Sequence, residues 1–440
     1  MKKIVLGLML MLMVALTGSA LYAQDIAGDW QGTLHVGPGL RLLLQVSKGD
    51  AKAGQGEWAA KLVSVDQGST TMPVDSISLQ NSTVKFAVSA IHGSYEGKLS
   101  SDGNSITGTW TQGPPMPLTF ERASKESSWL NDKSPHKVSL IPVDKDVNLE
   151  VLDWGGTGRP LVLLTGLGDT AHTFDTFAPK LTDKYHVYGI TRRGFGNSSA
   201  PVPANDNYSA DRLGDDVLAV IAALKLDKPV IAGHSIAGEE LSSIGSRHPE
   251  KVAGLIYLDA GYAYAFYNEK RGDMMVDMID LRNKLSAFLA GNIEDPKQGS
   301  LDIQANLAQL GKDLQGFDKK MASMPSPPKG SHPPPPPPII GAIMGGQQKY
   351  TQIKCPVLAI YADPHDYGPM FMKDDPAARK KALDDDKDRT TAQANAFQAG
   401  IPSAHVVLLP NASHMIYKSN EADVLREMNA FIAGLPAAKP

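Results

Sequence analysis

The segment that decides the fold is VIAGHSIAG, residues 230–238. An apolar run leads into small residues on both sides of Ser235, and a helix-forming stretch follows. This pattern predicts a buried strand, a tight turn and a helix, with the serine hydroxyl lifted above the edge of a sheet. The turn brings strand and helix close together, so small residues such as Gly233 and Ala237 fit there. Ser235 is therefore a candidate nucleophile.

Working outward, apolar runs bounded by turn residues recur along the second part of the chain. They are 159–164, 187–190, 230–232, 255–258, 357–361 and 406–409. Near-continuous apolar strands are typical of a parallel sheet covered on both faces. Residues 209–226 have helical spacing, with Ser209 as the expected N-cap. Alternating strands and helices predict an α/β doubly wound fold.

Three further turns accompany the serine segment in chain order. A glycine turn at 165–169 precedes it, an Arg-Gly-x-Gly turn lies at 192–196, and His414 follows the last apolar run. This order resembles the α/β-hydrolase superfamily over about residues 138–435, in its capped serine-esterase branch. The resemblance implies a doubly wound, mostly parallel sheet with a helical cap, here about residues 262–350.

The resemblance also implies a role for each group of a catalytic triad. Ser235 matches the nucleophile, and His414 matches the base that takes the hydroxyl proton. The acid orients the imidazole and stabilises its charged form. It is expected at Asp366, past the second-last strand; Asp363, at the same strand end, and Asp259, after the preceding strand, are the alternatives.

By the same resemblance, the backbone N–H groups of Leu167 and Ile236 form the oxyanion hole. Many relatives carry His-Gly in the first turn where this chain has Thr165 and Gly166, a change that keeps the backbone donor. Arg193 is expected to brace the loop that holds the site.

Other titratable residues have weaker claims. His234 lies in the turn itself, and His172, His365 and His405 lie away from the loop where the family places its histidine. Cys355 is the single cysteine, so the chain can form no internal disulfide and no multi-cysteine zinc site. With no ligand cluster or phosphate loop in the sequence, neither a metal nor an organic cofactor is expected.

The N-terminal residues predict export. Two lysines precede an apolar run at 4–16, and small residues follow at 18–20, as in a signal peptide covering residues 1–23 with cleavage near Ala23. The run is shorter than the ~20 residues that span a membrane, although an uncleaved anchor is the alternative. The expected protein is periplasmic or secreted, with no stable membrane insertion after cleavage.

Residues 24–122 have short alternating runs separated by turn residues, which predicts an all-β, barrel-like accessory domain. Trp30 and Trp110 are expected to fill its core; a ligand-binding barrel is the alternative. Polar residues 123–135 form a linker, and the hydrolase domain is expected to cover 136–440.

The expected cap contains two apolar helical stretches and a proline-rich segment. Residues 274–290 and 301–314 should pack over the serine. Nine prolines fall within 325–338, which favours polyproline II. That segment is interpreted as a stiff spacer, with a docking ligand for another protein as the alternative.

The composition and net charge exclude several classes of protein. The chain has 440 residues, 20% charged and 42% hydrophobic, with a net charge of −4. These values exclude a disordered tail protein and make nucleic acid an unexpected partner. The predicted function is an exported serine hydrolase acting on a small-molecule carboxylic ester. Alternatives are a peptidase, lactonase or thioesterase of the same fold, or a non-catalytic binding protein; epoxide hydrolases and haloalkane dehalogenases use an aspartate nucleophile, so Ser235 argues against them.

Overall fold

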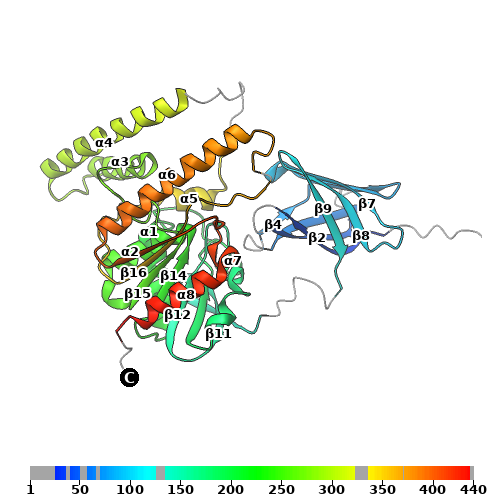
Figure 1. Ribbon diagram of the computed structural model, residues 1–440, viewed down its shortest axis with the longest axis horizontal. Helices are drawn as coiled ribbons and strands as arrows, with labels where there is room; N and C mark the ends of the chain where they lie inside the picture. Colours follow the sequence, from blue (N-terminus) through cyan, green and yellow to red (C-terminus); the bar gives the residue numbers. More distant parts are fainter. Residues whose placement is uncertain are drawn as a thin grey trace, which may run out of the picture. The chain divides into compact units, whose positions relative to one another are not determined.

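The computed structural model describes residues 25–35, 40–49, 57–65, 70–124, 134–322, 335–369 and 371–436 (Figure 1). The predicted signal peptide, most of the linker and most of the proline-rich segment lie outside the described residues. The chain divides into two compact units, one with most of a nine-stranded sheet and the other with an eight-stranded sheet and its helices.

The first unit is an antiparallel half-barrel, which confirms the all-β prediction. Its strands are β1 (Gly28–Leu34), β2 (Leu40–Lys48), β3 (Trp58–Ser64), β4 (Thr70–Pro73), β5 (Ser76–Gln80), β6 (Thr83–Val88), β7 (Gly93–Leu99), β8 (Ser105–Thr111) and β9 (Pro115–Arg122). Their spatial order is β4-β3-β2-β1-β9-β8-β7-β6-β5. Trp30 and Trp110 are buried in its core, as predicted, together with Tyr95 and Phe120. Aromatic side chains thus fill this unit.

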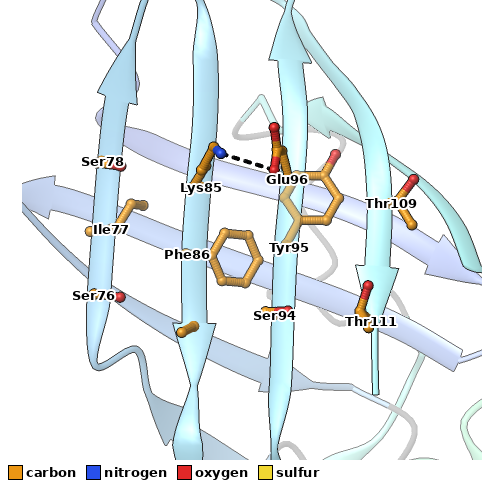
Figure 2. Close-up of a pocket in the computed structure, with 11 residues that line it drawn as sticks. Ser76, Ile77, Ser78, Lys85, Phe86, Ser94, Tyr95, Glu96, Thr109 and Thr111 are labelled. Atoms are coloured by element: carbon orange, nitrogen blue, oxygen red, sulfur yellow. Dashed lines mark ion pairs between the residues drawn. The ribbon is translucent and has the colours of Figure 1, made fainter. Parts of the chain in front are cut away.

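A hollow of about 530 Å³ opens on strands β5 to β8 (Figure 2). Hydroxyl side chains line much of it: Ser76, Ser78, Ser94, Thr109 and Thr111. An ion pair of 3.0 Å joins Lys85 to Glu96 across β6 and β7, and both side chains are more than half exposed. The residues that line this hollow include no histidine or cysteine, so it contains no nucleophile with a neighbouring imidazole base.

The second unit contains the predicted mostly parallel sheet. Its strands are β10 (Lys137–Asp144), β11 (Val147–Gly155), β12 (Arg159–Leu164), β13 (Tyr185–Ile190), β14 (Val230–His234), β15 (Gly254–Leu258), β16 (Val357–Ala362) and β17 (Ala404–Leu409). Their order is β10-β11-β13-β12-β14-β15-β16-β17. β10 and β11 pair antiparallel at one edge, and the strands from β13 to β17 are parallel. All six predicted apolar runs are strands of this sheet.

Helices cover both faces of the sheet (Figure 1). The described helices of this unit are α1 (Ala210–Ala223), α2 (Gly238–Arg247), α3 (Met274–Leu289), α4 (Pro296–Ala322), α5 (Pro338–Gly345), α6 (Pro376–Gly400), α7 (Ile416–Ser419) and α8 (Glu421–Ala433). Successive strand residues point to opposite faces. One face packs with α1, α2 and α6, and the other with α8. Ser209 caps α1, as predicted, by accepting a hydrogen bond from the Arg212 amide.

The interval between β15 and β16 contains helices α3, α4 and α5 among its described residues. The sequence predicted that the apolar faces of α3 and α4 pack over Ser235, but several apolar residues of these faces are exposed. Met275, Leu307 and Leu314 are each more than 40% exposed. Instead, Ile343 of α5 is fully buried in a cluster with Ile236, the residue after the candidate nucleophile. The short helix after the proline run therefore covers the elbow.

Candidate active site

The turn at the end of β14 has the geometry of a nucleophile elbow. Ser235 has a φ of 55°, in the left-handed region that non-glycine residues rarely adopt. A short 3₁₀ turn, Ser235–Ala237, leads into α2 at Gly238. A Cβ atom at Gly238 would lie 2.0 Å from the carbonyl oxygen of Ala260. The closest backbone approach thus falls at 238, which explains why alanine is accommodated at 237.

His414 lies beside the serine. Its Nε2 atom is 2.8 Å from the Ser235 Oγ, so the hydroxyl can donate to the imidazole. The histidine stands in the loop between β17 and α7, and 47% of its side chain is exposed. These two residues, from positions 179 apart in the sequence, are brought together as predicted.

The carboxylate that contacts His414 is not Asp366, the first choice from the sequence, but Asp259, one of the two alternatives. Asp259, immediately after β15, accepts a hydrogen bond from Nδ1 of His414 on its Oδ2 atom, at 2.6 Å. Asp366 instead accepts a hydrogen bond from the Gly368 amide at 2.7 Å. Asp363 accepts one from the hydroxyl of Thr391. Asp366 and Asp363 thus have hydrogen-bond partners other than His414, whereas the loop after β15 directs Asp259 toward the imidazole.

Asp259 is fully buried, and hydrogen bonds from four groups satisfy it. Besides His414, these are the His365 imidazole at 2.8 Å, the Tyr262 hydroxyl at 2.8 Å and the Ala362 amide at 3.1 Å. Burial alone would raise the pKa of this carboxyl, but the hydrogen bonds and charges of the two histidines outweigh burial and lower it. Asp259 is therefore a carboxylate at neutral pH.

The turn expected to supply the oxyanion hole is braced by a buried arginine. Arg192 donates to the carbonyl oxygens of Thr165 and Gly166, at 2.9 and 3.1 Å. The same guanidinium forms two hydrogen bonds with Glu240, at 2.6 and 2.8 Å. The brace expected from Arg193 is thus supplied by its neighbour.

Arg193 serves a different loop. It pairs with Asp216 of α1 through two bonds of 2.6 Å and donates to the Asn207 carbonyl oxygen. The two predicted oxyanion residues, Leu167 and Ile236, pack in one hydrophobic cluster beneath α5.

His234 anchors the histidine loop. Its Nε2 donates to the carbonyl oxygen of His414 at 2.9 Å. Burial lowers the pKa of His234 to about 3, and the nearby His414 acts in the same direction. A neutral imidazole that holds a backbone carbonyl has a structural role. This agrees with the expectation that His234, which lies in the turn itself, is a weaker candidate for the catalytic base than His414.

Aromatic residues after β15 divide between the site and the core. Burial, and then the charge of Asp259, raises the pKa of Tyr264 well above its ordinary value, and the neighbouring Ser235 opposes this rise. Phe266 and Tyr267 are buried elsewhere, and the Tyr267 hydroxyl donates to Asp277. Spacing along the sequence does not show which of these aromatic residues faces the serine.

Within the described ranges of the chain, two groups of His and Asp side chains have possible metal-ligand atoms that lie within 4.8 Å of one another. In the first, His136 and His172 approach Asp175 at 3.5 and 3.0 Å, a donor set that divalent metals accept. In the second, His365 and His414 both donate to Asp259, so hydrogen bonding accounts for that arrangement.

Residues 159–421, more than half of the chain, match the family described as alpha/beta hydrolase fold. The chain belongs to the α/β-hydrolase fold family. Among the relatives of this α/β-hydrolase, the fluoroacetate dehalogenase of a Burkholderia species is 32% identical over 117 residues, covering 26% of this chain and 38% of that protein. The AB hydrolase superfamily protein YisY of Bacillus subtilis is 29% identical over 183 residues, covering 41% and 62%.

A solved structure with a similar fold is a hydrolase from Pseudomonas aeruginosa PA01. It is 18% identical with a TM-score of 0.43, and the match covers 68% of this chain and 99% of that one. The chain spans less than two thirds of the length of the two curated relatives described above.

Proposed function

We propose that this α/β-hydrolase is an exported serine hydrolase that cleaves a carboxylic ester through Ser235, His414 and Asp259. The observation that carries the proposal is the unbroken hydrogen-bond chain from the serine Oγ through both imidazole nitrogens to the buried carboxylate. Serine hydroxyls are weak nucleophiles, and this arrangement supplies the base that they need and a group that orients the base.

In the proposed reaction, His414 accepts the hydroxyl proton as Ser235 Oγ attacks the ester carbonyl. The negative charge on the carbonyl oxygen is stabilised by the backbone N–H groups of Leu167 and Ile236. The carbonyl re-forms, the C–O bond to the alcohol breaks, and the imidazolium returns its proton to the leaving alcohol. Water, deprotonated by His414, then attacks the acyl-serine; the bond between the acyl carbon and Ser235 Oγ breaks, the imidazolium returns its proton to that oxygen, and the acid leaves. Asp259 stays ionised throughout and stabilises the imidazolium.

The nucleophile distinguishes this proposal from carbon–halogen cleavage, the activity in the name of the Burkholderia relative. Displacement of a halide by Ser235 would leave an alkyl ether on the enzyme. Water cannot release such an ether by attack at a carbonyl, because the linkage contains none. An acyl group on the same oxygen retains its carbonyl, which favours acyl transfer.

A fluorophosphonate probe tests the proposal together with p-nitrophenyl esters of increasing chain length. The wild type should be labelled and should hydrolyse a short ester, and Ser235→Ala should lose both properties. Asp259→Asn should lower kcat on the order of 10⁴-fold, whereas the matched variant Asp366→Asn should change it little. If the wild type is neither labelled nor active, the chain is a binding protein on a hydrolase scaffold; a larger loss in Asp366→Asn would restore the acid to Asp366.

The chemical bond that is cleaved is tested by competing substrates. Thioesters, lactones and aminoacyl amides use the same acyl-enzyme chemistry, and fold alone does not select among them. We expect kcat/KM for a short ester to exceed that for each of the other three classes. A reversed ranking would replace the ester with the preferred class.

Export is part of the proposal and rests on Lys2, Lys3 and the apolar run at 4–16. Among the described residues, no helix is both long enough and apolar enough to cross a bilayer. Expression of the full chain in a Gram-negative host should yield a periplasmic protein whose N-terminal residue is Gln24. A cytoplasmic protein that retains Lys2 would refute export without affecting the proposed reaction.

A further inference from the structure

His365 occupies a position between two buried carboxylates. Its Nε2 is 2.8 Å from Oδ2 of Asp259, and its Nδ1 is 2.8 Å from Oδ2 of Asp386, on α6. The backbone N–H of His365 also donates to Asp386, at 3.2 Å. All three side chains are less than a tenth exposed. The loop where many relatives place the acid therefore supplies an imidazole that contacts the acid.

An imidazole that donates from both nitrogens carries a positive charge. Burial would lower the pKa of His365, but its hydrogen bond with Asp259, the charge of that carboxylate and the pairing with Asp386 raise the pKa to about 9. His365 is therefore an imidazolium over the neutral range, with a carboxylate on each side.

Other polar groups surround this cluster. The Tyr262 hydroxyl lies 3.2 Å from His365 Nε2. Tyr367 and Arg389 donate to the second oxygen of Asp386, at 2.9 and 2.5 Å. The ring of His414 lies 6.0 Å from that of His365, centroid to centroid. Asp386 thus has its own donors on one oxygen, and its other oxygen binds His365.

We propose that His365 is a positioning residue: it holds the Asp259 carboxylate against His414 and, as a cation, weakens the attraction of that carboxylate for the His414 proton. This role rests on the proposed function of the triad. Asp259 Oδ2 accepts from both imidazoles, at 2.6 and 2.8 Å, so the two donors share one oxygen. The ring of His365 lies 6.0 Å from that of His414, centroid to centroid, so its positive charge disfavours a second positive charge on His414.

Removal of the cation is therefore expected to strengthen the attraction of the Asp259 carboxylate for the proton on His414. In His365→Gln, the acid limb of the kcat/KM profile should move to higher pH by about one to two units. The amide of glutamine can still donate to Asp259, so part of the positioning should remain. His405→Gln is the matched control, because His405 lies exposed on β17. Its profile should superimpose on that of the wild type.

Asp386→Asn provides a second variant that keeps the imidazole. Loss of one carboxylate should lower the pKa of His365, so the alkaline limb of the profile should move to lower pH by about one unit. Both profiles are measured with p-nitrophenyl acetate between about pH 5 and pH 10. Circular dichroism and melting curves establish that each variant is folded.

Histidine-selective ¹⁵N NMR gives a readout that does not depend on activity. At a fixed neutral pH, the ring ¹⁵N signals of His414, assigned from His414→Gln, should lie closer to the imidazolium position in folded His365→Gln than in the wild type, and the His365 signal should titrate at lower pH in Asp386→Asn. Unchanged titrations in folded variants overturn the proposal, as does a loss of stability with unshifted profiles. If the wild type fails the fluorophosphonate test while the titrations shift, the proposed function is wrong and the coupling between the two histidines stands.

Discussion

Two adjacent glutamates at the start of α2 have opposite environments. Glu240 forms two hydrogen bonds with Arg192, and both groups are buried. Glu239 is fully buried, and within the described part of the chain neither of its carboxyl oxygens has a hydrogen-bond partner. Burial, and then the charge of Glu240, raises the pKa of Glu239 well above its ordinary value, and Arg192 opposes them only in part. Glu239 is therefore a neutral acid at pH 7.

Glu239→Gln should stabilise the protein, and the gain should grow with pH. Above about pH 4.5 the unfolded chain releases a proton that folded Glu239 keeps. The free energy of unfolding of the wild type therefore falls as pH rises toward the raised pKa, and glutamine removes this dependence. Urea unfolding at three pH values measures the effect. A gain that is the same at every pH would contradict the assignment of a neutral Glu239.

The neighbouring variant Glu240→Gln is the contrast. It leaves the Arg192 guanidinium buried without its carboxylate, which typically costs about 3–5 kcal/mol. The same unfolding curves should show a loss for this variant, opposite in sign to the gain at 239. Equal effects of the two substitutions would mean that the two side chains share one environment.

At the scale of single residues, the sequence predicted that Ser235 and His414 approach each other, but it ranked Asp366 above Asp259, the carboxylate that contacts His414. Ser235 and His414 follow strands whose apolar pattern is unmistakable. Asp259 and Asp366 also follow strands, and β15 and β16 are neighbours in the sheet. Which carboxylate reaches the imidazole depends on the path of each loop, and spacing along the chain does not encode that path. His365 was missed for the same reason.

Among the elements, α5 has the closest connection to the site. Its eight residues, Pro338–Gly345, follow the proline run directly. Ile343 is fully buried with Leu213 and Ile236, and Ile339 packs against the same cluster. The helix is held to the elbow by a few side chains of its inner face, so it should open more readily than the sheet beneath it.

Ile343→Ala should release α5 selectively. Truncation of a buried isoleucine typically costs about 2–5 kcal/mol, and a short helix can open locally before the whole domain unfolds. Hydrogen exchange followed by mass spectrometry should show lost protection over 338–346 with the protection of β14 retained. Met344→Ala, on the exposed side of the same helix, should change stability by less than about 0.5 kcal/mol. If β14 loses protection together with α5, the helix is an integral part of the core.

At the same scale, the strands were predicted more completely than the cap. Each parallel strand is buried on both faces, so its sequence is a nearly continuous apolar run that is easy to recognise. The helices α3 and α4 carry apolar residues at helical spacing as well, yet several of these residues are exposed. Periodicity reveals that a helix has an apolar face, but it does not reveal what that face contacts.

At the scale of the whole molecule, the described residues contain two separate sheets. The half-barrel ends with β9 at Arg122, and the second sheet begins with β10 at Lys137. Each unit has its own buried aromatic or aliphatic core. Ser134 is joined to the second unit, because it accepts a hydrogen bond from the Trp154 indole at 2.8 Å.

A fragment covering residues 134–440 should therefore fold without the half-barrel. We expect cooperative thermal unfolding and hydrolysis of a short p-nitrophenyl ester at close to the full-length rate, because all the groups of the proposed triad lie within it. A fragment that begins after Trp154 is the control and should be insoluble, since it lacks β10 and β11. An insoluble or inactive 134–440 fragment would show that the half-barrel completes the hydrolase unit.

The contact between Gly238 and the Ala260 carbonyl has a consequence for the mutational tolerance of the elbow. Ala260 directly follows Asp259. The absence of a side chain at Gly238 therefore allows the start of α2 to lie close to the loop that carries Asp259. Saturation mutagenesis of the elbow should return several small residues at 237 but glycine alone at 238. A design that transfers the proposed triad to another scaffold must therefore reproduce the close approach of the backbones at 238 and 260 as well as the three side chains.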